Sequence, residues 1–278
     1  MQKENKLHLL NLCMKSWRLS KRNYQRMLRI AQPRLTKPIF FLHFPKCGGS
    51  SIASAIRSCY HASEVAHLDD AACVKAAESL GRDLDDYRRD LLLYYLLQQK
   101  IKYLSGHFAY SERAYQECGE RWHFVTVLRH PVDRWFSHFF YNKYKTGGHF
   151  KINEDISTFV ETERAYMLGR LYVRNLTEGT DRPDLHSVDT SKAVATAIKL
   201  LERFSLIGCL AHLDIMCRQF KDLFGVKLII PVLNVNSLSK ELQQEQITDK
   251  IRKRVEEICK PDLEVYKYAM SRIGQDYF

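Results

Sequence analysis

The stretch that decides the fold runs from Pro38 to Ile56 and reads PIFFLHFPKCGGSSIASAI. Its short apolar run, Ile39 to Phe44, predicts a buried strand, and the spacing of Ala and Ile after the glycines predicts a helix. Gly48 and Gly49 allow the backbone between them to turn sharply and to come close to a ligand. The stretch therefore predicts a strand, a tight loop and a helix.

The same stretch predicts an anion-binding site at the start of its helix. Ser50 or Ser51 is expected to cap the helix, whose first N–H groups and partial positive charge face the loop. Lys46 adds a full positive charge, so phosphate or sulfate would be held there. The alternative, from this stretch alone, is an ordinary strand–helix turn that carries a lysine by chance.

Composition and charge favour one folded globular protein with a separate basic arm. The chain has 278 residues, 45% of them hydrophobic and 27% charged, with a net charge of +11. Residues 1–37 hold ten Lys and Arg residues and one acidic residue, so most of the net charge lies there. The basic character therefore does not predict a nucleic-acid-binding enzyme. We expect a basic amphipathic helical arm over 1–37 and a single domain over 38–278.

The basic arm and the cysteine content indicate where in the cell the protein is expected to lie. Residues 1–32 predict a surface helix folded onto the domain, or one that contacts an anionic membrane surface. Eight cysteines occur without a CxxC pair or zinc-ligand spacing, which favours free thiols in a reducing compartment and no bound metal. With no apolar run of about 18 residues and no signal sequence, the expected location is the cytoplasm.

Strands and helices are predicted to alternate along the rest of the chain. Further strands are expected at 101–105, 123–128, 204–209 and 226–232. Helices are expected within 61–100 and over 131–145, 153–176, 190–203, 210–224, 240–258 and 261–274, the last beginning at Pro261-Asp262. Residues 175–188 form a polar loop and a candidate lid. This alternation predicts an α/β fold with a central parallel sheet flanked by helices, whose ligands bind at the carboxyl ends of the strands.

A second anion site is predicted in the segment Leu128 to Ser137, LRHPVDRWFS. Arg129 leaves the end of a predicted strand, and Ser137 lies about two turns into the following helix. An Arg guanidinium and a hydroxyl can hold one phosphate from two sides. A ligand with two separate anionic groups would bridge Lys46 and Arg129.

At these residues the chain resembles a known family. FPKCGGSS is similar to the 5′-phosphosulfate loop of sulfotransferases that use 3′-phosphoadenosine 5′-phosphosulfate (PAPS), and LRHPVDRWFSHFFY is similar to their 3′-phosphate motif. The segments LSGHFAY, FSLIGCLAHLD and LNVN are weaker similarities. The chain most resembles the Golgi-type carbohydrate sulfotransferases and their bacterial relatives. Cys47 departs from the family, which usually has Thr at this position.

The resemblance implies a P-loop-like three-layer sandwich, a PAPS cofactor with PAP as product, and roles for particular residues. Lys46 would stabilise the leaving group, and Arg129 with Ser137 would hold the 3′-phosphate. The 5′-phosphosulfate loop would bind through Lys46, Cys47, Gly48, Gly49, Ser50 and Ser51. No metal is required by these motifs. The acceptor would be a hydroxyl of a carbohydrate, a glycolipid or a small metabolite.

The general base is a separate prediction. His107 lies just after a predicted strand and resembles the acceptor-site histidine of the family. His43, Glu64 and Asp69 are its rivals, and His130 is expected to pack beside the phosphate site.

Three further predictions concern the remaining residues. An aromatic cluster, Trp135, Phe136, Phe139, Phe140 and Tyr141, is expected to be mostly core, with one ring available to adenine. Asn234 and Asn236 are candidate cofactor contacts. The alternative functions are a P-loop-type nucleotide kinase or NTPase, and a basic adaptor at a membrane surface.

Overall fold

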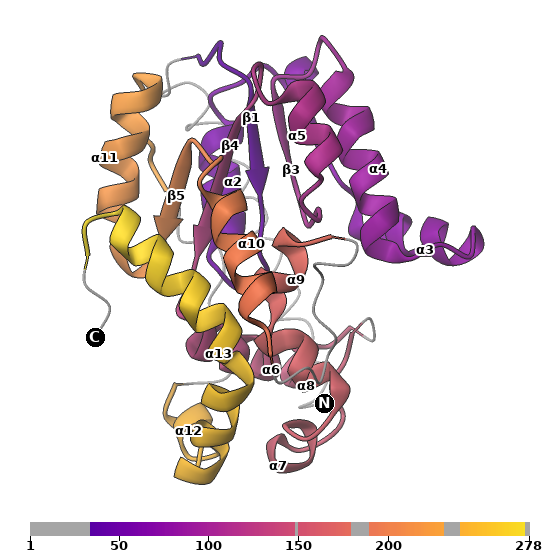
Figure 1. The fold of residues 1–278 in the computed structure, drawn as a ribbon, viewed down its shortest axis with the longest axis vertical. Coiled ribbons are helices and arrows are strands. Elements are labelled where there is room, and N and C mark those ends of the chain that lie inside the picture. Colours follow the sequence, from indigo (N-terminus) through magenta and orange to yellow (C-terminus); the bar gives the residue numbers. More distant parts are fainter. Residues whose placement is uncertain (1–33, 148–149, 179–188, 231–239, 276–278) are drawn as a thin grey trace, which may run out of the picture.

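The computed structural model describes residues 34–147, 150–178, 189–230 and 240–275. Its centre is a five-stranded sheet in the order β2-β3-β1-β4-β5, in which every neighbouring pair of strands is parallel (Figure 1). The strands are β1 (Ile39–Leu42), β2 (Val65–His67), β3 (Tyr103–Gly106), β4 (His123–Leu128) and β5 (Leu206–Cys209). The predicted α/β fold with a central parallel sheet is confirmed.

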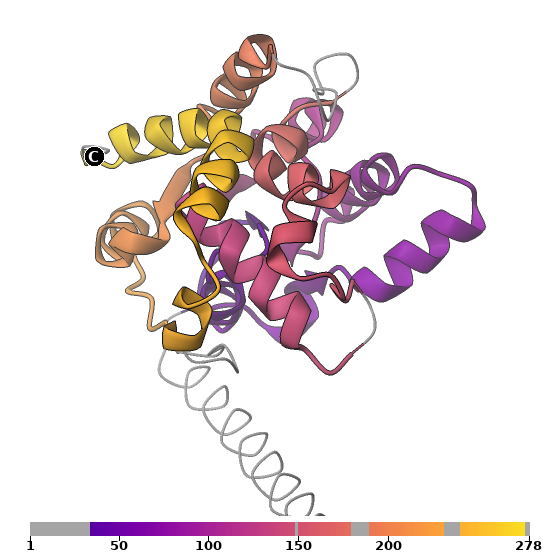
Figure 2. The same ribbon diagram turned by 90° about the horizontal axis from the view of Figure 1, so that it is seen from below.

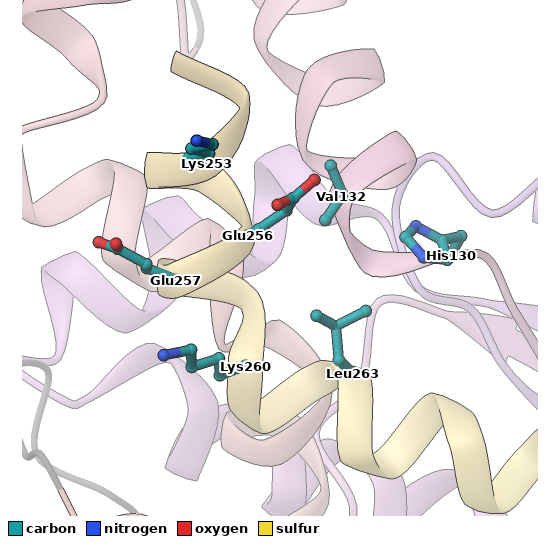
Figure 3. A pocket seen from close by; sticks show the side chains of 7 residues that line it. All are labelled: His130, Val132, Lys253, Glu256, Glu257, Lys260 and Leu263. Carbon is teal, nitrogen blue, oxygen red and sulfur yellow. The ribbon is translucent and has the colours of Figure 1, made fainter. Parts of the chain in front are cut away.

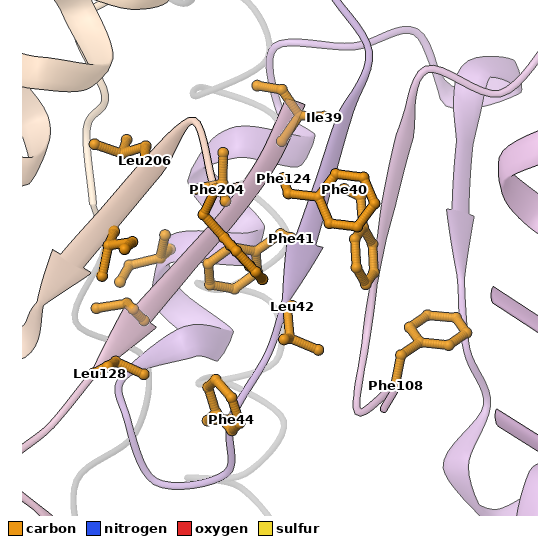
Figure 4. Packing of buried hydrophobic residues seen from close by; sticks show 14 of the residues in the cluster. Ile39, Phe40, Phe41, Leu42, Phe44, Phe108, Phe124, Leu128, Phe204 and Leu206 are labelled. Carbon is orange, nitrogen blue, oxygen red and sulfur yellow. The ribbon is translucent and has the colours of Figure 1, made fainter. Parts of the chain in front are cut away.

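Strand β1, IFFL, is apolar along its whole length because both faces of the sheet are covered. All four residues of β1 are fully buried, as a parallel sheet between helices requires. Phe40 packs edge-on against Phe108 and Phe124 on one face, with ring centroids 5.6 and 5.2 Å apart (Figure 4). Strand β1, which opens the Pro38–Ile56 stretch, is thus the middle strand of the sheet.

Helices cover both faces of the sheet and its carboxyl edge. They are α2 (Gly49–Arg57), α3 (Asp70–Ser79), α4 (Leu84–Leu97), α5 (Glu112–Cys118), α6 (Pro131–Tyr144), α7 (Ile156–Phe159), α8 (Glu163–Gly169), α9 (Leu171–Leu176), α10 (Ser191–Leu201), α11 (Leu213–Phe224), α12 (Lys240–Gln244) and α13 (Asp249–Arg272), with 3₁₀ turns η1 (Ala62–Glu64) and η3 (Leu210–His212). No helix of the described ranges is long and apolar enough to cross a membrane.

The two layers of helices are distinguished by their contacts with the strands. On one face, the Tyr103 hydroxyl of β3 donates to the Ala53 carbonyl of α2, and Met216 of α11 lies over Gly208 of β5. On the other face, Phe124 of β4 packs against Tyr115 of α5. Figures 1 and 2 place α2 and α10 on opposite sides of the sheet.

A second apolar cluster lies below the carboxyl edge of the sheet, where α6, α7, α8 and α13 meet. Trp135 and Phe139 of α6 stack at 5.9 Å, and both rings contact Phe159 of α7. Val255 and Ile258 of α13 complete this cluster. The cluster anchors α6, the helix that carries Ser137, against the rest of the molecule.

Several predicted elements differ from those observed. The three-residue edge strand β2 was not predicted, because a half-buried Val-Ala-His segment has no distinctive pattern. The predicted helix over 153–176 is three short helices, α7, α8 and α9. The predicted strand over 226–232 is wrong for residues 226–230, which pair with no strand of the described chain. Val226 and Leu228 alternate into the core, which explains the strand-like pattern.

The predicted helix start at Pro261-Asp262 is also wrong, because α13 continues through both residues. Figure 3 shows the helix axis changing direction between Lys260 and Leu263, as expected for a proline inside a helix. Asp262 does cap a helix, but a different one. Its carboxylate accepts the N–H groups of Tyr172 and Val173, at the start of α9, at 2.9–3.0 Å.

Candidate anion-binding and acceptor site

The residues predicted to carry function gather at one edge of the sheet. The loops after β1, β3 and β4 leave the carboxyl ends of three neighbouring parallel strands. They carry Lys46, His107 and Arg129 respectively. In open parallel sheets this edge is where ligands bind.

The loop after β1 has a constrained backbone. Lys46 and Gly48 both have a positive φ, 65° and 74°. The left-handed conformation is costly for a residue with a side chain, and such positions occur often at functional sites. Gly48 is the N-cap of α2, and no side chain caps the helix, so the predicted cap by Ser50 or Ser51 is wrong. Both serines lie inside the first turn, which contains no acidic residue.

The start of α2 is therefore suited to an anion. The first N–H groups of a helix have no acceptor within it, and they carry a partial positive charge. The Ser51 N–H turns back to the Gly48 carbonyl at 3.1 Å, which leaves Gly49 and Ser50 as the first donors of the turn. Ser50 is exposed at this position.

Gly49 is required by the packing of His43. A Cβ atom at position 49 would lie 2.0 Å from Cδ2 of the His43 ring. The ring thus rests on the backbone at the helix start, and it continues the site toward His107, whose ring centroid is 4.5 Å away. Burial, followed by the nearby His107 and His67 rings, holds the pKa of His43 well below its usual range. His43 is therefore neutral at physiological pH.

Lys46 contacts α6 as well as its own loop. Its Nζ atom lies 3.7 Å from the centre of the Tyr141 ring. Burial, followed by the positive charge of Arg129, lowers the pKa of Lys46 to about 8. An anion bound here would relieve both effects, because it supplies an opposite charge.

Arg129 joins the two predicted anion sites. Its Nη1 atom donates to the Lys46 carbonyl at 3.3 Å, so the guanidinium spans the gap between the loops after β1 and β4. Ser137 lies one helical turn before Tyr141, and residues four apart share one face of a helix. The face of α6 that contacts Lys46 is thus the face that carries Ser137.

The structure turns the Cys47 thiol away from the loop surface. Cys47 is fully buried, and its sulfur lies 3.2 Å from the Tyr172 hydroxyl. Burial raises the pKa of the thiol, which is therefore protonated. The expected contact of this position with a ligand is thus limited to its backbone. Tyr172 itself was not predicted, because nothing in its helical segment distinguishes it from a core tyrosine.

His107 lies between the β1 loop and α3. Its Nδ1 atom lies 2.6 Å from the His43 carbonyl, an acceptor, so Nδ1 carries a proton. Its Nε2 atom lies 3.5 Å from Oδ2 of Asp70, and Oδ1 of the same carboxylate accepts from Arg88 at 3.0 Å. Asp70 was not predicted, since it follows the more obvious helix cap Asp69.

The rival bases of the sequence interpretation have other partners. The Glu64 carboxylate pairs with Lys102 at 2.6 Å, and Asp69 accepts the Ala72 N–H at the start of α3. His130 packs edge-on against Tyr266 of α13, 5.7 Å between centroids, as a packing neighbour. Asn234, Asn236 and most of the predicted lid lie outside the described residues, as does the helix predicted over 1–32.

The predicted aromatic cluster divides into two groups. Trp135, Phe136, Phe139 and Phe140 are buried in the cluster below the sheet, whereas Tyr141 is 48% exposed and contacts Lys46. A separate cavity of about 400 Å³ lies between the start of α6 and α13, with His130 at one end (Figure 3). Lys253, Glu256, Glu257 and Lys260 give it a mixed charge, and none of the anion-site residues lines it.

Comparison with known proteins does not assign the chain to a family. No protein-family model matches the chain, and no curated protein matches its sequence. The function is therefore inferred from the site itself.

Proposed function

We propose that this protein is a PAPS-dependent sulfotransferase with a P-loop-like fold. The observation that carries the proposal is the contact of Arg129 with the Lys46 carbonyl. It brings two cationic loops, each at the end of its own strand, within reach of one ligand. A ligand with anionic groups at two ends, such as PAPS, suits this arrangement better than a single phosphate does.

The residues present fit the anionic groups of PAPS. The start of α2 offers N–H donors beside a glycine that permits close approach, with no acidic residue in the first turn. Lys46 provides a charge at this point, and Arg129 and Ser137 provide donors for a second phosphate. Bound PAPS would supply the sulfuryl group and leave as PAP.

The roles of the side chains follow from this placement. The Lys46 ammonium neutralises negative charge at the loop after β1, which is the stabilisation a phosphate leaving group needs. The backbone of Gly48 to Ser51 holds and orients the same group. No covalent intermediate is needed, because sulfuryl transfer, like phosphoryl transfer, depends mainly on positioning and charge.

His107 is suited to receive the proton of an acceptor hydroxyl. Because Nδ1 donates to the His43 carbonyl, Nε2 is the nitrogen left to accept. Asp70, with a carboxylate oxygen 3.5 Å from Nε2, is the acceptor that faces the Nε2–H once the proton has been transferred. The acceptor would be a hydroxyl of a carbohydrate or glycolipid, with a small hydroxylated metabolite as the alternative.

A nucleotide kinase or NTPase is the competing function. It would use the same anion site with ATP, but in this loop the lysine precedes the glycines, the reverse of the P-loop order. Turnover of ATP with magnesium, and none with PAPS, would replace the sulfotransferase proposal with this one.

The test combines cofactor binding with an acceptor screen. PAP binding is measured by calorimetry, and transfer from PAPS to a panel of glycans, glycolipids and metabolites is followed by the mass of an added sulfate. Lys46→Ala and Arg129→Ala are expected to lose binding and turnover. Arg218→Ala, which removes an exposed cation paired with Asp214, is the control. Wild-type turnover in both site variants would overturn the proposal.

A further inference from the structure

The hydroxyl of Tyr172 lies where the two anion loops meet. It donates to the Arg129 carbonyl at 2.7 Å and accepts the Arg129 N–H at 2.9 Å. The Cys47 sulfur lies 3.2 Å from the same oxygen. One side-chain atom therefore contacts the loop after β1 and the loop after β4, although the two loops lie far apart in the sequence.

The bonding capacity of this hydroxyl is fully used. A tyrosine hydroxyl has one proton to donate and two lone pairs that accept. The proton goes to the Arg129 carbonyl and one lone pair takes the Arg129 N–H, so the remaining lone pair faces the Cys47 sulfur, whose thiol also lies 3.8 Å from the Pro45 carbonyl. Burial, and then the neighbouring Cys47, raise the pKa of Tyr172, so the hydroxyl keeps its proton.

The tyrosine is itself held firmly by the rest of the fold. Its ring is fully buried, packs edge-on against Phe44 at 4.9 Å and lies under the guanidinium of Arg134 at 5.0 Å. Its backbone N–H donates to the carboxylate of Asp262 in α13. The hydroxyl is thus a fixed point from which the backbone of Arg129 takes its position.

We infer that Tyr172 is a positioning residue that sets the direction of the Arg129 side chain and thereby the preference of the site for a ligand with a second phosphate. The inference rests on the proposed function. The bond of the Arg129 guanidinium to the Lys46 carbonyl holds one end of this side chain, and the two bonds to the Tyr172 hydroxyl hold the backbone from which it extends. Losing both bonds to the Tyr172 hydroxyl would let the backbone at Arg129 relax, while the first anion site around Gly49 stays intact.

The test compares two ligands that differ in one phosphate, PAP and adenosine 5′-phosphate. Calorimetry on the full chain is expected to show tighter binding of PAP by the wild type. Tyr172→Phe should weaken PAP binding about five- to tenfold, the effect of about one net hydrogen bond, and change adenosine 5′-phosphate binding less than about twofold. Cys47→Ala should weaken PAP in the same direction but less, since a thiol is a weak donor.

Two matched controls remove a buried tyrosine hydroxyl elsewhere. The Tyr60 hydroxyl donates to the Lys37 carbonyl at 2.6 Å, and that of Tyr103 donates to the Ala53 carbonyl at 3.0 Å. Tyr60→Phe and Tyr103→Phe should leave the ratio of the two affinities unchanged. If the wild type binds PAP and Tyr172→Phe leaves the ratio of the PAP and adenosine 5′-phosphate affinities unchanged, the inference is overturned. Absence of PAP binding by the wild type would instead overturn the proposed function.

Discussion

The ammonium group of Lys46 lies 3.7 Å from the centre of the Tyr141 ring. The contact places the cation between the loop after β1 and the face of α6 that carries Ser137. Tyr141 is about half exposed, so the cation is shielded from water without being enclosed. This partial burial, together with Arg129, is what lowers the pKa of Lys46 to about 8.

The first prediction is a loss of PAP affinity above about pH 8. Lys46 is charged below its pKa and neutral above it, so the favourable charge at the first anion site disappears as the pH rises through 8. The affinity should fall about tenfold for each further unit of pH, because binding then requires uptake of one proton. Calorimetry between pH 7 and pH 9.5, in buffers of different ionisation enthalpy, measures both the affinity and the proton uptake.

Lys46→Arg is the control for this pH dependence. Arginine stays charged over the whole range, so the decline above pH 8 should disappear even if the affinity itself changes. A decline of the same size in Lys46→Arg would assign the titration to another group.

The second prediction is that Gly49→Ala strongly lowers PAP affinity and turnover, by more than a loss of stability alone would explain. The new Cβ would lie 2.0 Å from the His43 ring, so the ring must leave the helix start and its place beside His107. PAP affinity and turnover should both fall at least tenfold. Gly225 is the comparison, since it has a φ of 74° at the end of α11 and no atom within 4 Å of its would-be Cβ. Gly225→Ala should lower the melting temperature and leave PAP affinity unchanged.

The third prediction separates His107 from its rivals. His107→Ala should lower turnover about 10²- to 10⁴-fold, the usual contribution of a general base, with PAP affinity changed little. Asp70→Asn should also lower turnover, because it removes the carboxylate at 3.5 Å from Nε2. Glu64→Gln and Asp69→Asn should keep turnover within a few-fold of wild type, since these carboxylates face Lys102 and the start of α3. The assay is PAPS-dependent transfer to whichever acceptor the screen identifies; a large loss in Glu64→Gln with none in His107→Ala would reverse the assignment.

The two anion loops could be predicted from the sequence because their signals are local. An apolar run, a pair of glycines and a helical pattern lie within twenty residues around Lys46, and β4 with its following proline marks Arg129. The contacts that hold the two loops together could not be predicted, because one joins Arg129 to the Lys46 carbonyl 83 residues earlier and the others run through Tyr172, which lies 125 residues after Cys47 and 43 after Arg129.

The differences between the prediction and the structure at Asp262 and Asp70 also come from contacts between distant parts of the chain, whereas the one at Gly48 is local. Asp262 follows a proline, which is a common start of a helix, yet its carboxylate caps α9, 90 residues earlier in the chain. Gly48 caps α2 through its own backbone conformation, which a sequence pattern does not distinguish from a cap by Ser50 or Ser51. Asp70 gains its place beside His107 only because β3 and α3 meet at the carboxyl edge of the sheet.

The last prediction concerns the buried pair beneath the site. Asp262 and Arg134 are both fully buried, with 3.4 Å between a carboxylate oxygen and Nη2, and Asp262 also caps α9 through Tyr172 and Val173. Asp262→Ala leaves the Arg134 charge buried without its counter-charge, so the free energy of unfolding should fall by about 3–5 kcal/mol. Asp69→Ala, which removes an exposed cap from α3, should cost only about 1 kcal/mol. The amide oxygen of Asp262→Asn still accepts the α9 N–H groups, so the loss in free energy of unfolding for this variant should lie between those of Asp262→Ala and Asp69→Ala. Urea unfolding measures all three, and equal losses in Asp262→Ala and Asp69→Ala would show that Asp262 acts as a cap alone.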